Sequence, residues 1–252
     1  QPRSRGLGDV YKRQGNPFYL EEILNALVDS NALAFENGQW AMNRAFKESD
    51  IPSTIHGVIA SRMDQLGPVD RRILQEAAVI GRAFLYKILK RISVHGDAVD
   101  DSLYKLERAG LIKPRALHPE MEFMFKHALI QEVSYGSLLR RERQRVHERI
   151  GLTIEQVYQD RLSEFDETLA IHFQKSTATD KATDYLIRSG TKALRRCALD
   201  ESDQYFKTAK AMLEQQQLAT PETKKRLLDV ANQWAFVFYY KGLNRQLLEL
   251  LE

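Results

Sequence analysis

The chain has 252 residues, of which 43% are hydrophobic and 28% are charged, a balance that is ordinary for globular proteins. Lys and Arg number 37 against 34 Asp and Glu, which leaves a formal net charge of +3. A single cysteine, Cys197, excludes an internal disulfide and a cysteine-based zinc site. The longest apolar run, Trp234–Tyr240, is far short of the ~20 residues of a membrane span. Because no signal peptide is recognisable either, we expect a cytoplasmic protein without a membrane partner.

Residues 1–14, QPRSRGLGDVYKRQ, show neither a helical nor a strand period. The codons GAT GTG TAT AAG AGA CAG can encode residues 9–14, and they resemble the end of a transposase adapter used in library preparation. We therefore interpret residues 1–14 as an adapter artefact, with a disordered arm as the alternative, and exclude them from the fold. The segment carries a net charge of +3, equal to that of the whole chain, from Arg3, Arg5, Lys12 and Arg13 against Asp9. The rest of the chain is therefore balanced in charge.

Residues 15–66 are predicted to form two helices with a β-hairpin between them. Pro17 suits the first turn of a helix. Asn37-Gly38 stands between two short apolar runs and predicts a β-hairpin. Ser53 can cap a second helix. The apolar stripes of the two helices follow the i, i+3, i+4 spacing of one buried face: Leu20, Ile23, Leu24, Leu27 and Val28, then Ile55, Val58, Ile59, Met63 and Leu66.

Residues 67–127 are predicted to form a winged helix. Helical patterns cover Asp70–Ile80, Phe84–Ile92 and Ala98–Ala109, and strand-like runs follow at Leu111–Arg115 and Glu120–Phe125. Three helices followed by a β-hairpin is the element order of a winged helix-turn-helix. Residues 128–176 then read as connecting helices.

Residues 177–252 are predicted to begin an array of tetratricopeptide-like repeats. Gly190, Ser202, Phe206 and Ala209 reproduce the spacing of the small and aromatic signature positions of such a repeat. Small residues let the paired helices approach, and the aromatic ring fills the contact. The predicted fold class is therefore mainly α, with a small β-hairpin in the winged helix.

A second, less regular repeat is predicted around Trp234, Phe238 and Gly242, which makes residues 215–222 a linker. Repeats need neighbours to bury their faces, so more repeats are expected to follow. The helical pattern of Leu247–Glu252 stops without a capping signal. We therefore expect the chain to be an internal piece of a longer protein.

Two motifs carry a family resemblance. Residues 15–22, GNPFYLEE, resemble the segment that ends the ATPase module of signal-transduction ATPases with numerous domains. This resemblance implies that residues 15–66 are the C-terminal part of an ATPase lid. Residues 125–135, FKHALIQEVSY, resemble the motif that closes the winged helix of those proteins, and residues 141–150 resemble the helix that opens their repeats. The similarity is closest to bacterial chains in which a class III adenylate/guanylate cyclase domain precedes such an ATPase and a tetratricopeptide array.

The resemblance implies a nucleotide switch. In related switches the proline of a G-x-P motif lies beside the adenine, and the histidine of an M-H-D motif contacts the β-phosphate of ADP. Pro17 and His127 match these positions, while Lys126 and Ala128 replace the Met and the Asp. The resemblance therefore implies that Pro17 and His127 contact nucleotide, and that exchange of ADP for ATP releases the winged helix.

Catalytic and metal chemistry is not expected from these residues. No G-x-x-x-x-G-K-[ST] run occurs, so the phosphate cradle of an ATPase is missing. His147-Glu148 begins like a zinc-protease helix, but Gly151 stands where the second histidine belongs. We therefore predict no catalytic residue and no metal ligand. ATP and ADP are expected in the complete protein, an ATPase and cyclase candidate, and neither is expected to bind this piece tightly.

Three functions compete at this point. The first is the regulatory part of a nucleotide-switched signalling ATPase that controls a linked cyclase. Its partners would be the upstream ATPase domain of the same chain and a protein or peptide on the repeats. The second is a winged-helix transcriptional regulator, although the candidate recognition helix Asp97–Gly110 carries a net charge of −2 and so disfavours DNA. The third is a plain tetratricopeptide scaffold that binds proteins.

Overall fold

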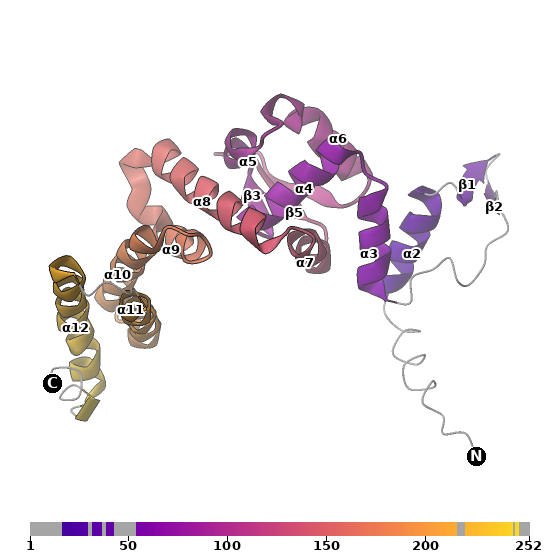
Figure 1. Ribbon diagram of the computed structural model, residues 1–252. Coiled ribbons are helices and arrows are strands. Elements are labelled where there is room, and N and C mark those ends of the chain that lie inside the picture. The colour runs from indigo at the N-terminus through magenta and orange to yellow at the C-terminus, as the bar shows by residue number, and fades with distance from the viewer. Residues whose placement is uncertain are drawn as a thin grey trace, which may run out of the picture. The chain divides into compact units, whose positions relative to one another are not determined.

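The computed structural model describes residues 17–29, 32–36, 39–42, 54–215, 220–243 and 245–246. The described chain is mainly helical with short antiparallel strands, which confirms the predicted mainly-α class (Figure 1). The chain forms two compact units that divide between Leu139 and Arg140. Residues 1–14, Asn37-Gly38 and Ser53, on which three predictions rest, lie outside the described residues.

The first unit begins with helix α2, Pro17–Asp29, which starts at the predicted proline. Strands β1, Leu33–Glu36, and β2, Gln39–Met42, pair antiparallel as the hairpin prediction requires. Helix α3, Ile55–Asp64, packs against α2. Its N-cap is Thr54 and not Ser53, because the Thr54 hydroxyl accepts a hydrogen bond from the Gly57 amide at 3.1 Å.

A three-stranded sheet lies beside the next helices. Helices α4, Pro68–Ile80, α5, Tyr86–Ile92, and α6, Val99–Arg108, are followed by strands β4, Ile112–Ala116, and β5, Glu122–Phe125. The short 3₁₀ turn η2, Gly96–Ala98, leads into α6. The sheet also contains strand β3, Ala83–Leu85, and has the order β3-β5-β4 with antiparallel pairing throughout. Helix α7, Ala128–Gly136, follows it.

Strand β3, Ala83–Leu85, corrects the sequence prediction, which placed Phe84 in a helix. Pairing with β5 sets Phe84 opposite Phe123, and the two rings stack with centroids 6.0 Å apart. The Phe84 ring also meets Phe125 edge-on at 5.8 Å. Cross-strand aromatic packing therefore outweighs the local helical pattern at this position.

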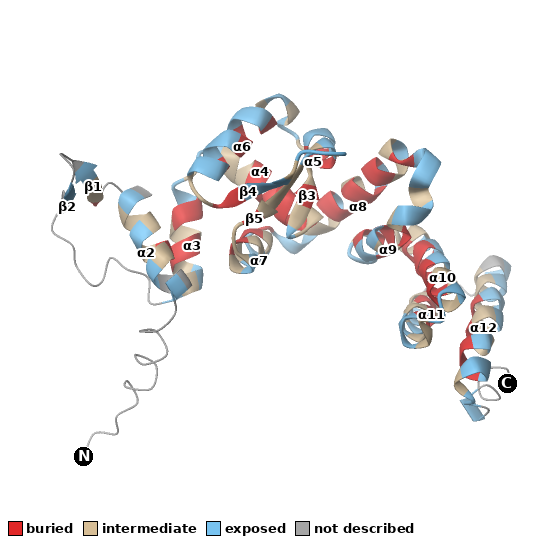
Figure 2. Cartoon of the chain, turned by 180° about the vertical axis from the view of Figure 1, so that it is seen from behind, coloured by how far each residue is buried: buried red, intermediate tan, exposed pale blue. Residues whose placement is uncertain are grey.

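The core of the first unit joins all of its elements from α3 onward. Helices α3 and α4 each present a buried face, red in Figure 2. The fully buried residues with the largest side chains in this core are Ile59, Met63, Ile73, Leu74, Phe84, Leu89, Leu106 and Phe125. At about 1.5–3 kcal/mol for each such side chain, this cluster is the main stabilising term of the unit.

The second unit is a succession of helices in which each packs against the next. They are α8, Arg140–Val157, the 3₁₀ segment η3, Gln159–Phe165, and helices α9, Asp166–Gln174, α10, Thr179–Arg195, α11, Leu199–Glu214, and α12, Pro221–Lys241. The predicted linker 215–222 is too long, because Thr220 caps α12 and Pro221 and Glu222 are helical. Within the described ranges, every helix is too short or too polar to cross a membrane.

Two glycines let helices of the second unit approach closely. A Cβ on Gly190 would lie 3.0 Å from the Phe206 ring, and the Ser202 hydroxyl donates to the Gly190 carbonyl at 2.8 Å. The same contact recurs between α8 and α9, where a Cβ on Gly151 would lie 2.6 Å from the ring of Phe173. The sequence analysis did not identify this second pair, because η3 lengthens the spacing between its two members.

Candidate functional site

The two motifs that carry the family resemblance meet in the first unit. Glu21 of α2 accepts a hydrogen bond from the Lys126 ammonium at 2.5 Å, although the two residues are 105 positions apart in sequence. The second carboxylate oxygen of Glu21 lies 3.8 Å from Nε2 of His127. We refer to Glu21, Lys126 and His127 as the motif junction.

The backbone of the sheet and of α7 positions the two basic residues. Lys126 follows directly on β5, and its amide donates to the Leu111 carbonyl at 3.0 Å. His127 is the extended N-cap of α7, and its carbonyl accepts from the Ile130 amide at 3.2 Å. The His127 side chain makes no capping hydrogen bond of its own. The side chain is 33% exposed as a whole, but its Nε2 atom, which faces Glu21 of α2, is buried.

The electrostatics of the motif junction favour an anion. The hydrogen bond from Lys126 lowers the pKa of Glu21 below its ordinary value, and the charges of Lys126, His127 and Arg62 act in the same direction against the effect of burial. Glu21 is therefore a carboxylate at neutral pH. Since Lys126 and His127 offer N–H donors, a phosphate group could take the place of this carboxylate.

A buried ion pair fixes α2 next to the motif junction. Arg62 of α3 donates to Glu22 at 2.6 Å, and the two side chains are 1% and 0% exposed. Arg62 also donates to the Ala109 carbonyl at 2.5 Å, so it ties α2 and α3 to the end of α6. Buried charges are costly unless they are paired, so this geometry leaves α2 little freedom to shift on α3.

Sequence reasoning missed this ion pair although a signal was present. Arg62 interrupts the apolar stripe that runs through Val58, Ile59 and Met63, and it lies on the same buried face of α3. Because an unpaired charge is costly to bury, a charged residue at such a position indicates a buried partner of opposite charge. The identity of Glu22 as that partner follows only from the packing of α2 on α3.

Pro17 stands apart from this cluster. It is the first residue of α2 and is exposed. The described contacts bring Glu21, and not Pro17, to His127. Pro17 is therefore not part of the motif junction.

Three cations on or near the surface that a DNA-binding winged helix would use form ion pairs within the first unit. On α6, Lys105 lies 3.6 Å from Asp70, and Asp100 accepts from the Lys90 ammonium at 2.8 Å. In the hairpin, Arg115 pairs with Glu122 at 3.2 Å. Cations engaged in this way are poorly placed to neutralise phosphates, which argues against a DNA interface.

The incomplete zinc-protease motif, His147-Glu148 with Gly151, lies on helix α8. The His147 imidazole is buried and contacts that of His172, with the two Nδ1 atoms 2.8 Å apart. Gly151, where a second zinc ligand would stand, packs on Phe173. In the described part of the chain, no three His, Cys, Asp or Glu side chains gather as a metal site would require.

Comparison with known proteins adds one relative. A protein of Rhizobium meliloti (strain 1021), whose printed name is "uncharacterized protein", is 25% identical over 199 residues. The match covers 77% of this chain, which spans only 19% of the length of that relative. No family model matches the chain, and no solved structure matches it.

Proposed function

We propose that this chain is the regulatory part of a nucleotide-switched signalling ATPase. In this proposal α2 and α3 end the ATPase lid, residues 67–127 form a winged helix, and the second unit begins a tetratricopeptide-like array that senses a protein or peptide. The chain would relay the ATP or ADP state of the upstream domain to the repeats and to a linked cyclase. ATP hydrolysis and cyclase activity would belong to other parts of the longer protein.

The motif junction is the observation that carries this proposal. Glu21 belongs to the first motif, Lys126 and His127 belong to the second, and an ion pair joins them. A nucleotide phosphate would compete with the Glu21 carboxylate for these two donors. Because ADP and ATP differ in the phosphates they present, each can favour a different arrangement of α2 against the start of α7.

The roles of two residues follow from the resemblance. Pro17 would lie against the adenine, and His127 would donate to the β-phosphate of ADP. Lys126 adds a positive charge that the M-H-D motif lacks, and it would strengthen phosphate binding. The chain alone would bind ADP weakly, because the main phosphate cradle is missing from it.

The test uses the longer protein that this proposal implies. Its coding sequence should contain a G-x-x-x-x-G-K-[ST] motif upstream of residue 15. His127→Ala should weaken ADP binding about tenfold, measured by isothermal titration calorimetry, because one charge-assisted hydrogen bond is lost. The matched control is His95→Ala, which removes an exposed histidine of the same unit. Unchanged ADP affinity in His127→Ala, or an upstream sequence without the motif, would contradict the proposal.

A second candidate function is a scaffold that binds proteins through the second unit. The contacts of Gly190 with Phe206 and of Ser202 with the Gly190 carbonyl are those expected between the paired helices of a tetratricopeptide repeat. If the longer protein ignored ADP and ATP but captured a protein partner through the second unit, the scaffold function would replace the switch.

A further inference from the structure

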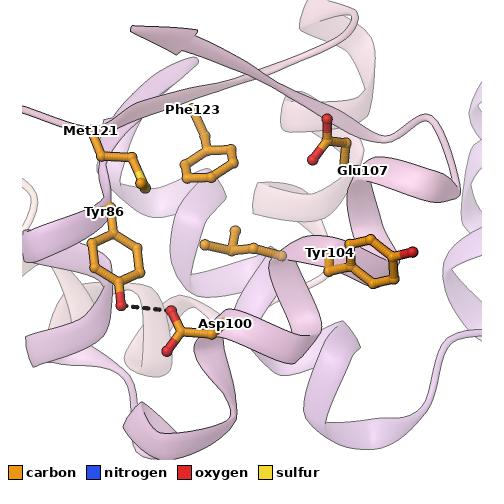
Figure 3. Close-up of a pocket in the computed structure, with 7 residues that line it drawn as sticks. Tyr86, Asp100, Tyr104, Glu107, Met121 and Phe123 are labelled. Carbon is orange, nitrogen blue, oxygen red and sulfur yellow. Dashed lines mark hydrogen bonds between the residues drawn. The ribbon is translucent and has the colours of Figure 1, made fainter. Parts of the chain in front are cut away.

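A cavity of about 190 Å³ lies between α5, α6 and β5 in the first unit (Figure 3). Its walls are largely apolar and come from Tyr86, Leu103, Tyr104, Met121 and Phe123. Small-molecule pockets typically measure about 300–1,000 Å³, whereas a space of about 150 Å³ already holds a benzene-sized group. The cavity therefore has the size for one large apolar side chain and is too small for a cofactor.

Two of the wall residues are unusually exposed for their type. Tyr104 is 62% exposed and Met121 is 41% exposed, and both line the same opening. Single exposed apolar side chains need no explanation, but Tyr104 and Met121 lie together at the mouth of one cavity. Tyrosine and methionine are also enriched where protein partners dock.

Within the described chain, the rim of the cavity carries one carboxylate, Glu107, that is not part of an ion pair, because Asp100 is paired with Lys90. The two charged lining residues of the cavity, Asp100 and Glu107, are both carboxylates. Among the residues that the structure describes, none forms an ion pair with Glu107, and its carboxylate borders the cavity beside Phe123 in Figure 3. Two cations stand close to the cavity: Lys90 is bonded to Asp100, and the Arg108 guanidinium lies 5.8 Å from the centroid of the Tyr104 ring. An incoming basic group would still meet the Glu107 carboxylate.

One wall of the cavity is held in place by hydrogen bonds. The Tyr86 hydroxyl donates to Asp100 at 2.6 Å, and the Lys90 ammonium donates both to Tyr86 at 2.6 Å and to Asp100 at 2.8 Å. These bonds, first of all that from Lys90, lower the pKa of Asp100. A wall that is fixed before binding loses little conformational freedom when a partner arrives.

We propose that this cavity docks a protein partner through one large apolar side chain that is flanked by basic residues. The apolar side chain would enter between Tyr104 and Met121, and a neighbouring Lys or Arg would pair with Glu107. The surface is the one a DNA-binding winged helix would present, but the carboxylate of Glu107, unpaired in the described chain, disfavours a phosphate and favours a basic group of a peptide.

The experiment measures binding of defined probes to the whole chain by fluorescence anisotropy. The first probe is a short fluorescein-labelled peptide with a central Phe flanked on both sides by Lys-Lys. A peptide with Ser in place of Phe, a peptide with Glu in place of Lys, and a short duplex DNA are the comparison probes. The Phe–Lys peptide should bind, and the other peptides should bind at least about tenfold more weakly.

Matched variants assign the binding to the cavity. Tyr104→Ala should weaken the Phe–Lys peptide about tenfold, whereas Tyr239→Ala, at a similarly exposed tyrosine of α12, should not. Glu107→Lys should weaken it about fivefold or more, whereas Glu132→Lys, at an exposed position of α7, should not. Circular dichroism confirms that each variant is folded.

Three results would overturn the proposal. These are failure of the Phe–Lys peptide to bind, equal binding of the Glu-flanked peptide, and peptide binding that both cavity variants leave unchanged. The duplex DNA probe tests the alternative that this surface binds DNA. Glu107→Lys would tighten a DNA complex, whereas it would weaken the peptide complex. DNA binding that outcompetes the peptide and tightens in this way would replace a protein partner with DNA.

Discussion

Different interactions fix neighbouring helices within each of the two units. In the first unit, α2 is fixed by charged groups, through the buried pair of Glu22 with Arg62 and the more open pair of Glu21 with Lys126. In the second unit, helices meet where glycines lie against phenylalanine rings. An incoming anion can compete for an exposed ionic contact, whereas a contact between a glycine and a ring is sensitive mainly to side-chain volume. The Glu21 contact of the first unit is therefore open to an anion, and the contacts at Gly151 and Gly190 depend on volume.

The largest expected effect comes from the buried ion pair. Arg62→Ala leaves the Glu22 carboxylate buried without its cation, which should cost about 3–5 kcal/mol of unfolding free energy in the first unit. Hydrogen exchange of amides in α3 and α4 measures this unit separately from the second. The double variant Glu22→Leu with Arg62→Met should recover most of the loss, because no buried charge remains. A cost below about 1 kcal/mol for Arg62→Ala would show that the pair does not fix α2.

Acid should act next most strongly, and on the second unit. Burial, aided by His172, Lys175 and Arg143, lowers the pKa of His147 to about 3, and burial with Lys175 lowers that of His172 to about 4. Below about pH 6.5 the two histidines bind protons in the unfolded state but stay neutral in the folded state. The free energy of unfolding of the second unit therefore decreases as the pH falls. Between pH 7 and 5.5 the loss should reach about 2–3 kcal/mol.

Hydrogen exchange of α8 and α9 as a function of pH checks this expectation after correction for intrinsic exchange. The first unit, where His56 and His95 are exposed, serves as the internal control and should keep its protection. If α8 and α9 keep constant protection down to pH 5.5, the two imidazoles are not buried as neutral groups.

Volume should matter most where glycine meets phenylalanine. Gly151→Ala places a methyl group against Phe173, and overpacking of about 1–3 kcal/mol outweighs the gain of about 1 kcal/mol in helix propensity. Gly190→Ala should cost less because its contact is looser. Gly136→Ala at the end of α7 is the matched control, since nothing lies within 4 Å of the added methyl group. Urea denaturation should rank Gly151→Ala below Gly190→Ala and both below Gly136→Ala. Equal midpoints for Gly151→Ala and Gly136→Ala would contradict this.

The smallest effect on stability belongs to the motif junction. Glu21→Gln removes a partly exposed ion pair and should cost no more than about 1 kcal/mol at pH 7. Because the folded pKa of Glu21 is lowered, its contribution is present above the ordinary pKa of 4.5 and is lost as pH falls through the folded value. Wild type and Glu21→Gln should therefore converge in acid, as chemical denaturation would measure. A cost above about 3 kcal/mol would make Glu21 a structural residue and not a displaceable one.

Local signals in the sequence predicted much of this fold. Pro17 marks the start of α2, and Asn37-Gly38 correctly predicts the pairing of β1 with β2. Helical periodicity located α4, α5 and α6 to within a few residues. Each of these features depends on neighbours in sequence, which is why the residues alone suffice. The winged-helix and repeat assignments stay predictions, because they concern likeness to families.

Long-range pairings were missed for a physical reason. Phe84 joins β3 only because β5, about forty residues later, offers it a partner strand. The pairing of Arg62 with Glu22 and the contact of Gly151 with Phe173 likewise depend on which helices come together. At the candidate site, the family resemblance pointed to Pro17 and His127 and gave Lys126 only as a departure from the motif, while Glu21 and its pairing with Lys126 emerged from the tertiary contact.

The most direct test of the nucleotide switch is hydrogen exchange of the amides of residues 126–136 in the longer protein, in ADP and in a non-hydrolysable ATP analogue. We expect slower exchange in ADP, because the phosphate contact of His127 holds the start of α7. His127→Ala should abolish the difference, while the amides of α10 and α11 should exchange alike in both nucleotides. Equal exchange of residues 126–136 in ADP and in the analogue would contradict the switch.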